Sequence, residues 1–129
     1  MLAPSVTQAA NAFPLLGRVA LVTGGSQGIG RAIAIALALH GADVAFTWRS
    51  SAAEATDTLQ TLERIGRGAV AVTADGRSTF DVETAVAQTC ERFGGLDILV
   101  NNAGMARDHV GWKRNDDDRI DVVDAAITS

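Results

Sequence analysis

The sequence predicts an α/β domain in which a doubly wound parallel sheet lies between helix layers. Short apolar runs alternate with segments of helix length, and these runs are VALV (19–22), DVAF (43–46), AVAV (69–72) and DILV (97–100). Apolar residues at consecutive positions suit strands that are buried on both faces, as in a parallel sheet. A glycine-rich turn directly follows the first run. These observations predict four strands in βαβαβαβ order.

Length and composition fit one globular domain. The 129 residues are 47% hydrophobic and 20% charged, with a net charge of -4 and a pI near 5.0. A nucleic-acid or acidic-membrane partner is therefore not expected. Cys90 is the single cysteine, which excludes an intramolecular disulfide and fits a cytoplasmic location. Residues 1–16 lack the features of a signal peptide and are expected to form a lead-in, and no apolar run approaches the roughly 20 residues of a membrane span.

Three helices are expected between the strands. The first, residues 29–39, is apolar on nearly every face. The second, residues 52–65, and the third, residues 79–93, carry their apolar residues on one stripe and their charges elsewhere. The acidic segment NDDDR (115–119) is interpreted as the solvated start of a further helix rather than as a metal site, because Asp side chains favour the positive N-terminal end of a helix dipole.

The turn after the first strand has the composition of a phosphate-binding loop. A helix N-terminus offers an anion unpaired backbone N–H groups and a positive dipole end, and glycine is needed where a Cβ would hold the backbone away. Gly24 is expected to permit the tight turn, Gly28 the close approach of phosphate, and Gly30 the packing of the helix on the sheet. The alternative is a purely structural turn. The candidate binding residues in this turn are Gly24, Ser26, Gln27, Gly28, Ile29 and Gly30.

Two motifs together resemble the short-chain dehydrogenase/reductase family. TGxxxGxG occupies residues 23–30 and NNAG occupies residues 101–104, and the segments RVALVTGGSQGIGRAIA and DILVNNAG are similar to the 3-oxoacyl-[acyl-carrier-protein] reductase branch. The resemblance implies a Rossmann-type sheet with strand order 3-2-1-4, a nicotinamide dinucleotide as partner, and NAD(P)-dependent carbonyl reduction or alcohol oxidation. Because family members are generally much longer, it also implies that residues 17–129 form an incomplete dinucleotide-binding domain, truncated after about four strands.

In that family the turn after the second strand selects the cofactor. An acidic residue there would hydrogen-bond the ribose 2′-OH of NAD, whereas a basic residue pairs with the 2′-phosphate of NADP. Arg49 occupies this turn in the segment TWRSS, and no acidic residue does. NADP(H) is therefore favoured over NAD(H), with an ordinary surface arginine as the alternative interpretation of Arg49.

The resemblance implies further cofactor contacts after the third and fourth strands. Asp75 matches the aspartate that meets the adenine ring, although Gly76 stands where the family usually has an apolar residue. Asn102, Ala103 and Gly104 would lie beside the cofactor at the carboxyl end of the fourth strand. For the asparagine pair of NNAG, a structural turn is an equally acceptable interpretation.

The catalytic residues of the family have no counterparts in this sequence. They are a Ser followed by YxxxK, but the chain contains no tyrosine and its only serine after the NNAG motif is Ser129. The family also places an Asn on the helix after the fourth strand, and aligning residues 115–129 with that helix puts Ala126 at this position. His109 and Lys113 are interpreted as loop residues rather than as substitutes. No catalytic residue and no metal ligand is therefore assigned.

Three functions stay open. The chain is the NADP(H)-binding portion of an oxidoreductase that is inactive alone, a non-catalytic nucleotide-binding module, or a half-sheet that pairs with another chain. Strand order 3-2-1-4 leaves the fourth strand, Asp97–Val100, at a sheet edge with Asp97 as its charged guard. Unpaired backbone groups at such an edge invite pairing, so self-association or a partner chain is expected there.

Overall fold

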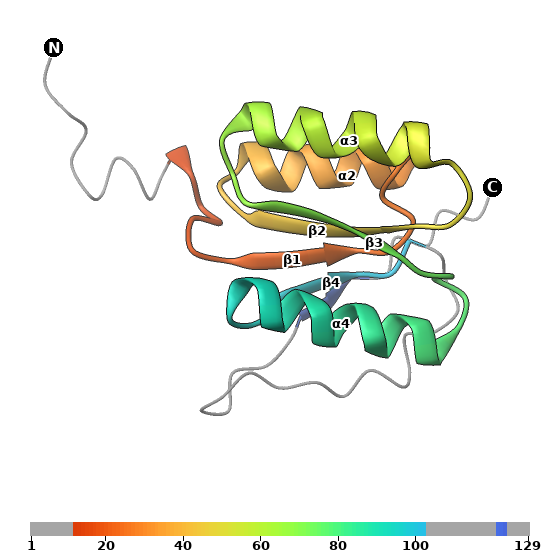
Figure 1. Ribbon diagram of the computed structural model, residues 1–129. Helices are drawn as coiled ribbons and strands as arrows, with labels where there is room; N and C mark the ends of the chain where they lie inside the picture. Colours follow the sequence, from red (N-terminus) through yellow and green to blue (C-terminus); the bar gives the residue numbers. More distant parts are fainter. Residues whose placement is uncertain (1–11, 103–120, 124–129) are drawn as a thin grey trace, which may run out of the picture.

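The computed structural model describes residues 12–102 and 121–123 of the chain (Figure 1). Four strands alternate with three helices, and a short fifth strand follows. In chain order the elements are β1 (Val19–Val22), α2 (Gly28–Leu39), β2 (Asp43–Trp48), α3 (Ala52–Ile65), β3 (Ala69–Thr73), α4 (Thr79–Phe93), β4 (Ile98–Val100) and β5 (Asp121–Val123).

The sheet is parallel throughout and has the order β3-β2-β1-β4-β5. Helices α2 and α3 cover one face and α4 covers the other (Figure 1). The predicted order 3-2-1-4 and the predicted Rossmann-type fold class are therefore confirmed. Val19 lies opposite Asp43 in β2 and Val22 lies opposite Phe46, so β1 is the central strand on which both flanks depend.

The expectation that the fourth strand forms the sheet edge is wrong. Strand β5 pairs with β4 in parallel, with Ile98 opposite Asp121 and Val100 opposite Val123. This parallel pairing is possible because residues 101–120 are long enough for the crossover of a dozen or more residues that parallel neighbours require. The sequence does not predict this three-residue strand, because it follows closely after the acidic segment NDDDR (115–119), which favours the start of a helix. The premise for self-association through β4 is thus removed.

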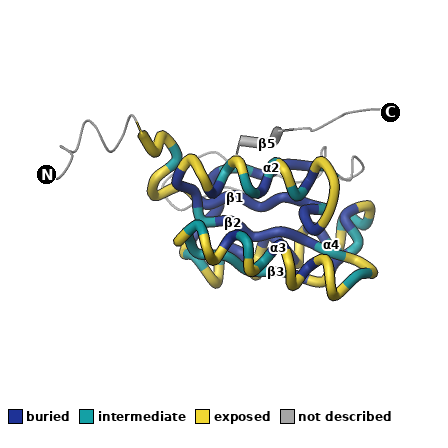
Figure 2. The backbone as a smooth tube through the Cα atoms, turned by 90° about the horizontal axis from the view of Figure 1, so that it is seen from above, coloured by how far each residue is buried: buried dark blue, intermediate teal, exposed yellow. Residues whose placement is uncertain are grey.

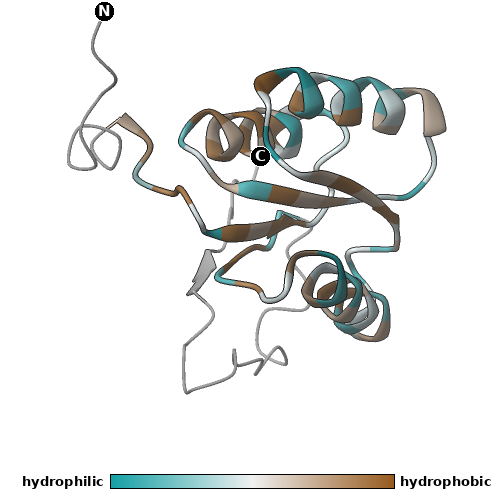
Figure 3. Cartoon of the chain, turned by 60° about the vertical axis from the view of Figure 1, so that its left-hand side comes forward, coloured by the Kyte–Doolittle hydropathy of each residue, from teal (hydrophilic) through white to brown (hydrophobic). Residues whose placement is uncertain are grey.

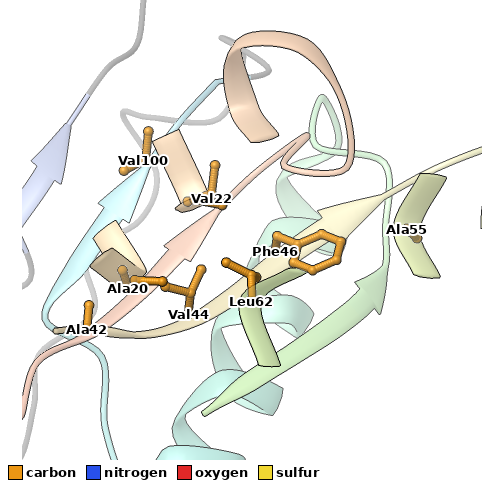
Figure 4. Packing of buried hydrophobic residues seen from close by; sticks show 10 residues of the cluster. Ala20, Val22, Ala42, Val44, Phe46, Ala55, Leu62 and Val100 are labelled. Atoms are coloured by element: carbon orange, nitrogen blue, oxygen red, sulfur yellow. The ribbon is translucent and has the colours of Figure 1, made fainter. Parts of the chain in front are cut away.

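Alternate residues of the strands fill two separate cores, as the twofold side-chain period of a strand requires. Val19 and Leu21 pack toward α4, whereas Ala20 and Val22 pack toward α2 and α3. Figure 4 shows the second core, in which Phe46 is fully buried. The central strands are dark blue in Figure 2 and largely hydrophobic in Figure 3. Burial on both faces explains why the strands consist of continuous apolar runs.

Helix α2 packs on the sheet through small side chains. Gly30, Ala34 and Ala38 are its buried residues and follow one another at intervals of four along one face. Small residues let the helix axis approach the strands closely. Of its larger apolar residues, Ile29 and Leu39 are 46% and 56% exposed, whereas Ile33, Ile35 and Leu37 are partly buried against the core. The close approach therefore sets the distance between the first turn of α2 and the end of β1.

The ends of α3 and α4 follow from local sequence. The hydroxyls of Ser51 and Ser78 accept hydrogen bonds from the backbone N–H groups three residues later, at 3.2 Å in each case. Gly66 and Gly94 end the two helices in the left-handed conformation, which glycine adopts without a Cβ penalty. The predicted ranges of both helices match the observed ones.

The last residues of the lead-in contact the body of the domain. The Leu15 N–H donates to the carbonyl of His40 at 2.9 Å, and the guanidinium of Arg67 lies 4.8 Å from the centroid of the Phe13 ring. In the part of the chain that the structure describes, no helix is long and apolar enough to span a bilayer.

Asp97 is a structural residue at the start of β4 and not the guard of an exposed edge. Its side chain is buried and accepts a hydrogen bond from the Val19 backbone N–H at 2.8 Å, while its own N–H donates to the Val19 carbonyl at 2.9 Å. The Arg18 guanidinium lies 3.5 Å away and is largely exposed. The carboxylate thus ties β4 to the beginning of the central strand.

We expect Asp97→Ala to lower the free energy of unfolding by about 1–3 kcal/mol, because the buried Val19 N–H loses this acceptor. Arg18→Ala is the matched control and should cost less than about 1 kcal/mol, since its ion pair is solvent-screened. Urea unfolding followed by circular dichroism measures both. Equal losses in the two variants would show that the buried hydrogen bond contributes no more to stability than the exposed ion pair.

Candidate functional site

A cleft of about 210 Å³ opens at the carboxyl ends of β1, β2 and β3. Its walls come from the β1–α2 turn, the end of β2, the start of α3 and the β3–α4 loop. In open parallel sheets this end of the strands is where ligands bind, next to the point at which the strand order reverses. The lining residues are Gly24, Ser26, Gln27, Thr47, Trp48, Arg49, Ser50, Ser51, Glu54, Ala74, Asp75, Gly76 and Arg77.

The turn between β1 and α2 uses its glycines in two different ways. Gly24 has φ 67° and Gly28 has φ 58°, which are left-handed conformations that side chains disfavour. A Cβ on Gly28 would meet no atom within 4 Å, so the space beside it is open. A Cβ on Gly30 would lie 2.0 Å from the carbonyl oxygen of Gly24. Gly30 therefore permits the first turn of the helix to lie directly against the turn that leaves β1.

The N-terminus of α2 has no side-chain cap. Its N-cap residue, Gln27, makes no side-chain hydrogen bond to the helix, and the first turn carries no acidic residue. A helix N-terminus without a side-chain cap keeps N–H groups and a positive dipole end available to an anion. These donors are the chemical feature that a phosphate group recognises.

Hydrogen bonds from three neighbouring elements hold the turn. Thr47 of β2 accepts from the Gly24 N–H at 2.9 Å, and the Thr58 hydroxyl of α3 donates to the Ser26 carbonyl at 2.8 Å. Beyond β4, the amide of Asn102 donates to the Gly24 carbonyl at 3.2 Å. The turn is thus fixed by tertiary contacts, and Asn102 has a structural role in holding it.

The turn after β2 contains a cationic side chain, Arg49, close to the N-terminus of α3. Arg49 is exposed, and no hydrogen bond or ion pair to it is found among residues 12–102 and 121–123. Ser50 and Ser51 follow at the start of α3, where Ser51 is the N-cap. An arginine and serine hydroxyls at a helix start are groups that bind phosphate.

Asp75 carries a fixed negative charge on the opposite wall of the cleft. Its carboxylate accepts from the backbone N–H of Arg77 at 2.9 Å and from the Arg77 Nε at 3.2 Å. The Arg77 side chain and backbone, with a smaller contribution from the charge of Arg49, lower the pKa of Asp75. The carboxylate is therefore ionised at neutral pH and oriented by its neighbour.

The structure brings together most of the predicted residues that it describes. Gly24, Ser26, Gln27, Arg49 and Asp75 line the cleft. Gly28 lines a second depression, of about 370 Å³, on the outer side of the turn.

Three other predicted residues lie outside the cleft lining. Ile29 is 46% exposed on α2, and Gly30 and Asn102 contact the turn from behind. Ala103 and Gly104 fall outside the described residues, as do His109, Lys113 and Ala126.

Sequence reasoning missed several cleft residues. Thr47, Trp48, Ser51, Glu54 and Arg77 line the cleft but were not identified as site residues. The segment SAAE (51–54) has the S-x-x-E spacing of a capping box and thus carried a usable signal for Ser51 and Glu54. Arg77 carried none, since only the turn of the β3–α4 loop brings it beside Asp75. In the described part of the chain, no three His, Cys, Asp or Glu side chains are close enough to hold a metal ion.

The different surroundings of Gly28 and Gly30 predict different losses of stability when each is replaced by alanine. Gly30→Ala should lower the free energy of unfolding by about 3 kcal/mol or more, because the new methyl group meets a backbone carbonyl that cannot move away without opening the turn. Gly28→Ala should cost about 1–2 kcal/mol, since it adds backbone strain without a clash. Urea unfolding compares the two. A Gly28 variant less stable than the Gly30 variant would contradict the assigned contact.

The comparisons with known proteins agree with this geometry. The family model described as short chain dehydrogenase matches residues 18–129. The hydroxynaphthalene reductase arp2 of Aspergillus fumigatus is 45% identical over 74% of this chain and 35% of its own length. The 3-oxoacyl-[acyl-carrier-protein] reductase FabG of Staphylococcus aureus is 36% identical over 84% of this chain and 44% of its own length. The chain thus spans less than half the length of these curated relatives.

Solved structures give the same result. A short chain dehydrogenase from Burkholderia cenocepacia in complex with NADP has a TM-score of 0.67 and 49% identity, covering 79% of this chain and 40% of that one. A blue fluorescent protein from a metagenomic library, in complex with NADPH, also has a TM-score of 0.67 and 49% identity, covering 70% of this chain and 38% of that one. The family model, the relatives and the fold agree, and the chain belongs to the short-chain dehydrogenase/reductase family.

Proposed function

We propose that this chain is the NADP(H)-binding portion of a short-chain dehydrogenase/reductase oxidoreductase, with residues 17–129 as the dinucleotide-binding domain. The observation that carries the proposal is the uncapped N-terminus of α2 at the edge of a cleft that also contains Arg49. A nicotinamide dinucleotide has a pyrophosphate in its middle and, in NADP(H), a further phosphate on the adenosine ribose. The two cationic features match these two groups.

The pyrophosphate would bind the first turn of α2. Gly28 has open space where a side chain would stand, which supports close approach of a phosphate to the backbone. Ser26 and Gln27 line the same edge. The hydrogen bonds from Thr47, Thr58 and Asn102 would keep the N–H groups of this turn in place before the ligand arrives, so little ordering is needed on binding.

The adenosine would occupy the cleft between Arg49 and Asp75. The ionised carboxylate of Asp75 is an acceptor for the adenine amino group, and Arg49 with Ser50 and Ser51 would hold the 2′-phosphate. Relatives include proteins whose structures were solved with NADP or NADPH and a dehydrogenase named for NAD(P)(+). Ala103 and Gly104 are proposed contacts on the nicotinamide side.

The chemistry of the bound cofactor would be hydride transfer to a carbonyl carbon or from an alcohol. Such a reaction also needs a group that moves the proton on the substrate oxygen. The 129 residues contain no tyrosine, and Ser129 is their only serine after the NNAG motif. We therefore propose that this polypeptide binds the cofactor without turning over substrate, as a part of a larger enzyme. The same cleft would serve a non-catalytic nucleotide-binding module.

Arg49→Ala tests the cofactor assignment. We expect NADPH affinity to fall about tenfold to a hundredfold, because a charge-assisted contact to the 2′-phosphate is worth about 1.5–3 kcal/mol. NADH affinity should stay unchanged, and Arg64→Ala, at the far end of α3, should affect neither cofactor. Quenching of Trp48 fluorescence measures the six affinities of the unmodified chain and the two variants for NADPH and NADH. Equal affinity of the unmodified chain for both cofactors would contradict the preference.

A second experiment tests the catalytic part of the proposal. The 129-residue polypeptide should oxidise NADPH with carbonyl substrates no faster than a buffer blank, since general acid catalysis typically contributes about 10² to 10⁴-fold. The Arg49→Ala variant, purified in parallel, reports any contaminating host reductase. Substrate-dependent oxidation by the unmodified chain that is lost in this variant would show that other residues supply the proton.

A further inference from the structure

Four charged side chains line the cleft, and they differ in how their charges are compensated. Asp75 is paired with Arg77 at 3.2 Å, which neutralises both. Arg49 and Glu54 take part in no ion pair among residues 12–102 and 121–123. One positive and one negative side chain without an ion-pair contact in the described residues therefore face the same cleft.

Glu54 does not use its side chain in the way its sequence context favours. Ser51 and Glu54 have capping-box spacing, and the Ser51 hydroxyl does accept from the Glu54 N–H at 3.2 Å. In a complete capping box, the glutamate would turn back to the N–H of the N-cap residue. Instead, its carboxylate faces the phosphate loop, where the Gln27 amide, oriented with its nitrogen toward it, donates to both oxygens at 3.2 and 2.5 Å.

The partner of Glu54 is neutral, so the negative charge stays at the mouth of the cleft. Glu54 lines both the cleft and the outer depression, as Gln27 does. Arg49 and Glu54 line this one cleft of about 210 Å³, and the Debye length at physiological ionic strength is about 8 Å. An anion held in the cleft by Arg49 is therefore within range of the carboxylate.

We propose that Glu54 is a specificity-determining residue that opposes Arg49. It weakens binding of the 2′-phosphate of NADP(H) by charge repulsion, while its bond to Gln27 keeps the phosphate loop in place for the pyrophosphate that both cofactors share. The preference for NADP(H) is consequently narrow and reflects the balance of these two residues. This inference rests on the proposed nucleotide-binding function.

The variant Glu54→Gln removes the charge but leaves an amide oxygen that can still accept from Gln27. We expect its affinity for NADPH to rise about three- to tenfold at low salt, as repulsion between charges at this separation predicts. NADH carries the pyrophosphate but lacks the 2′-phosphate, so its affinity should rise less than that of NADPH, and the ratio of the two affinities reports the effect on the 2′-phosphate. Added salt should reduce the gain, since Glu54 is exposed.

The matched control is Glu63→Gln, which makes the same charge change on the same helix. It lies nine residues further along α3, about 13 Å away at the helical rise, and should leave both affinities unchanged. Isothermal titration calorimetry of NADPH and NADH against the unmodified chain and both variants gives the ratio of NADPH affinity to NADH affinity for each form.

The outcomes separate this inference from the function on which it rests. An unchanged NADPH-to-NADH ratio in Glu54→Gln, with normal binding of both cofactors, would overturn the role of Glu54 alone. An equal gain in Glu63→Gln would overturn it too, because the effect would then reflect net charge. Failure of every form to bind either cofactor would instead contradict the proposed function.

Discussion

The close contact between the first turn of α2 and the turn that leaves β1 is the constraint on which the site depends. Gly30 lies against the Gly24 carbonyl, where a Cβ would come within 2.0 Å. Ala34 and Ala38 extend the same small face along the helix, which lets α2 lie low on the sheet. Because the helix is held this close to the sheet, the N–H groups of its first turn lie at the carboxyl end of the central strand.

The loop is held from outside its own sequence. Side chains of β2, of α3 and of Asn102 hydrogen-bond to its backbone, and no side chain caps the N-terminus of α2. This division of roles is what preorganised anion binding requires. It also explains why Asn102 matters to the site even though it lies behind the turn.

The four charged side chains around the cleft fall into two groups, one joined by an ion pair and one not. Arg77 orients the Asp75 carboxylate and pairs with its charge. Arg49 and Glu54 have no ion-pair contact within the described residues, so the electrostatic potential in the cleft depends on both of their charges. In the proposed function, discrimination between two cofactors that differ by one phosphate would depend on both of these side chains and not on Arg49 alone.

Local patterns in the sequence determined the four main strands, the glycine turn and the ends of α3 and α4. These features follow from apolar runs, serine caps and left-handed glycines, which act within a few residues of one another. Strand β5, the burial of Asp97 and the meeting of Glu54 with Gln27 were decided by tertiary structure. A strand of three residues is too short to show a recognisable sequence pattern, and its backbone pairing with β4 is what defines it. Asp97 and Glu54 are charged residues whose partners lie 78 and 27 positions away along the chain, at Val19 and Gln27. Only the folded sheet brings such groups within hydrogen-bonding distance, because no periodicity in the sequence encodes the separation.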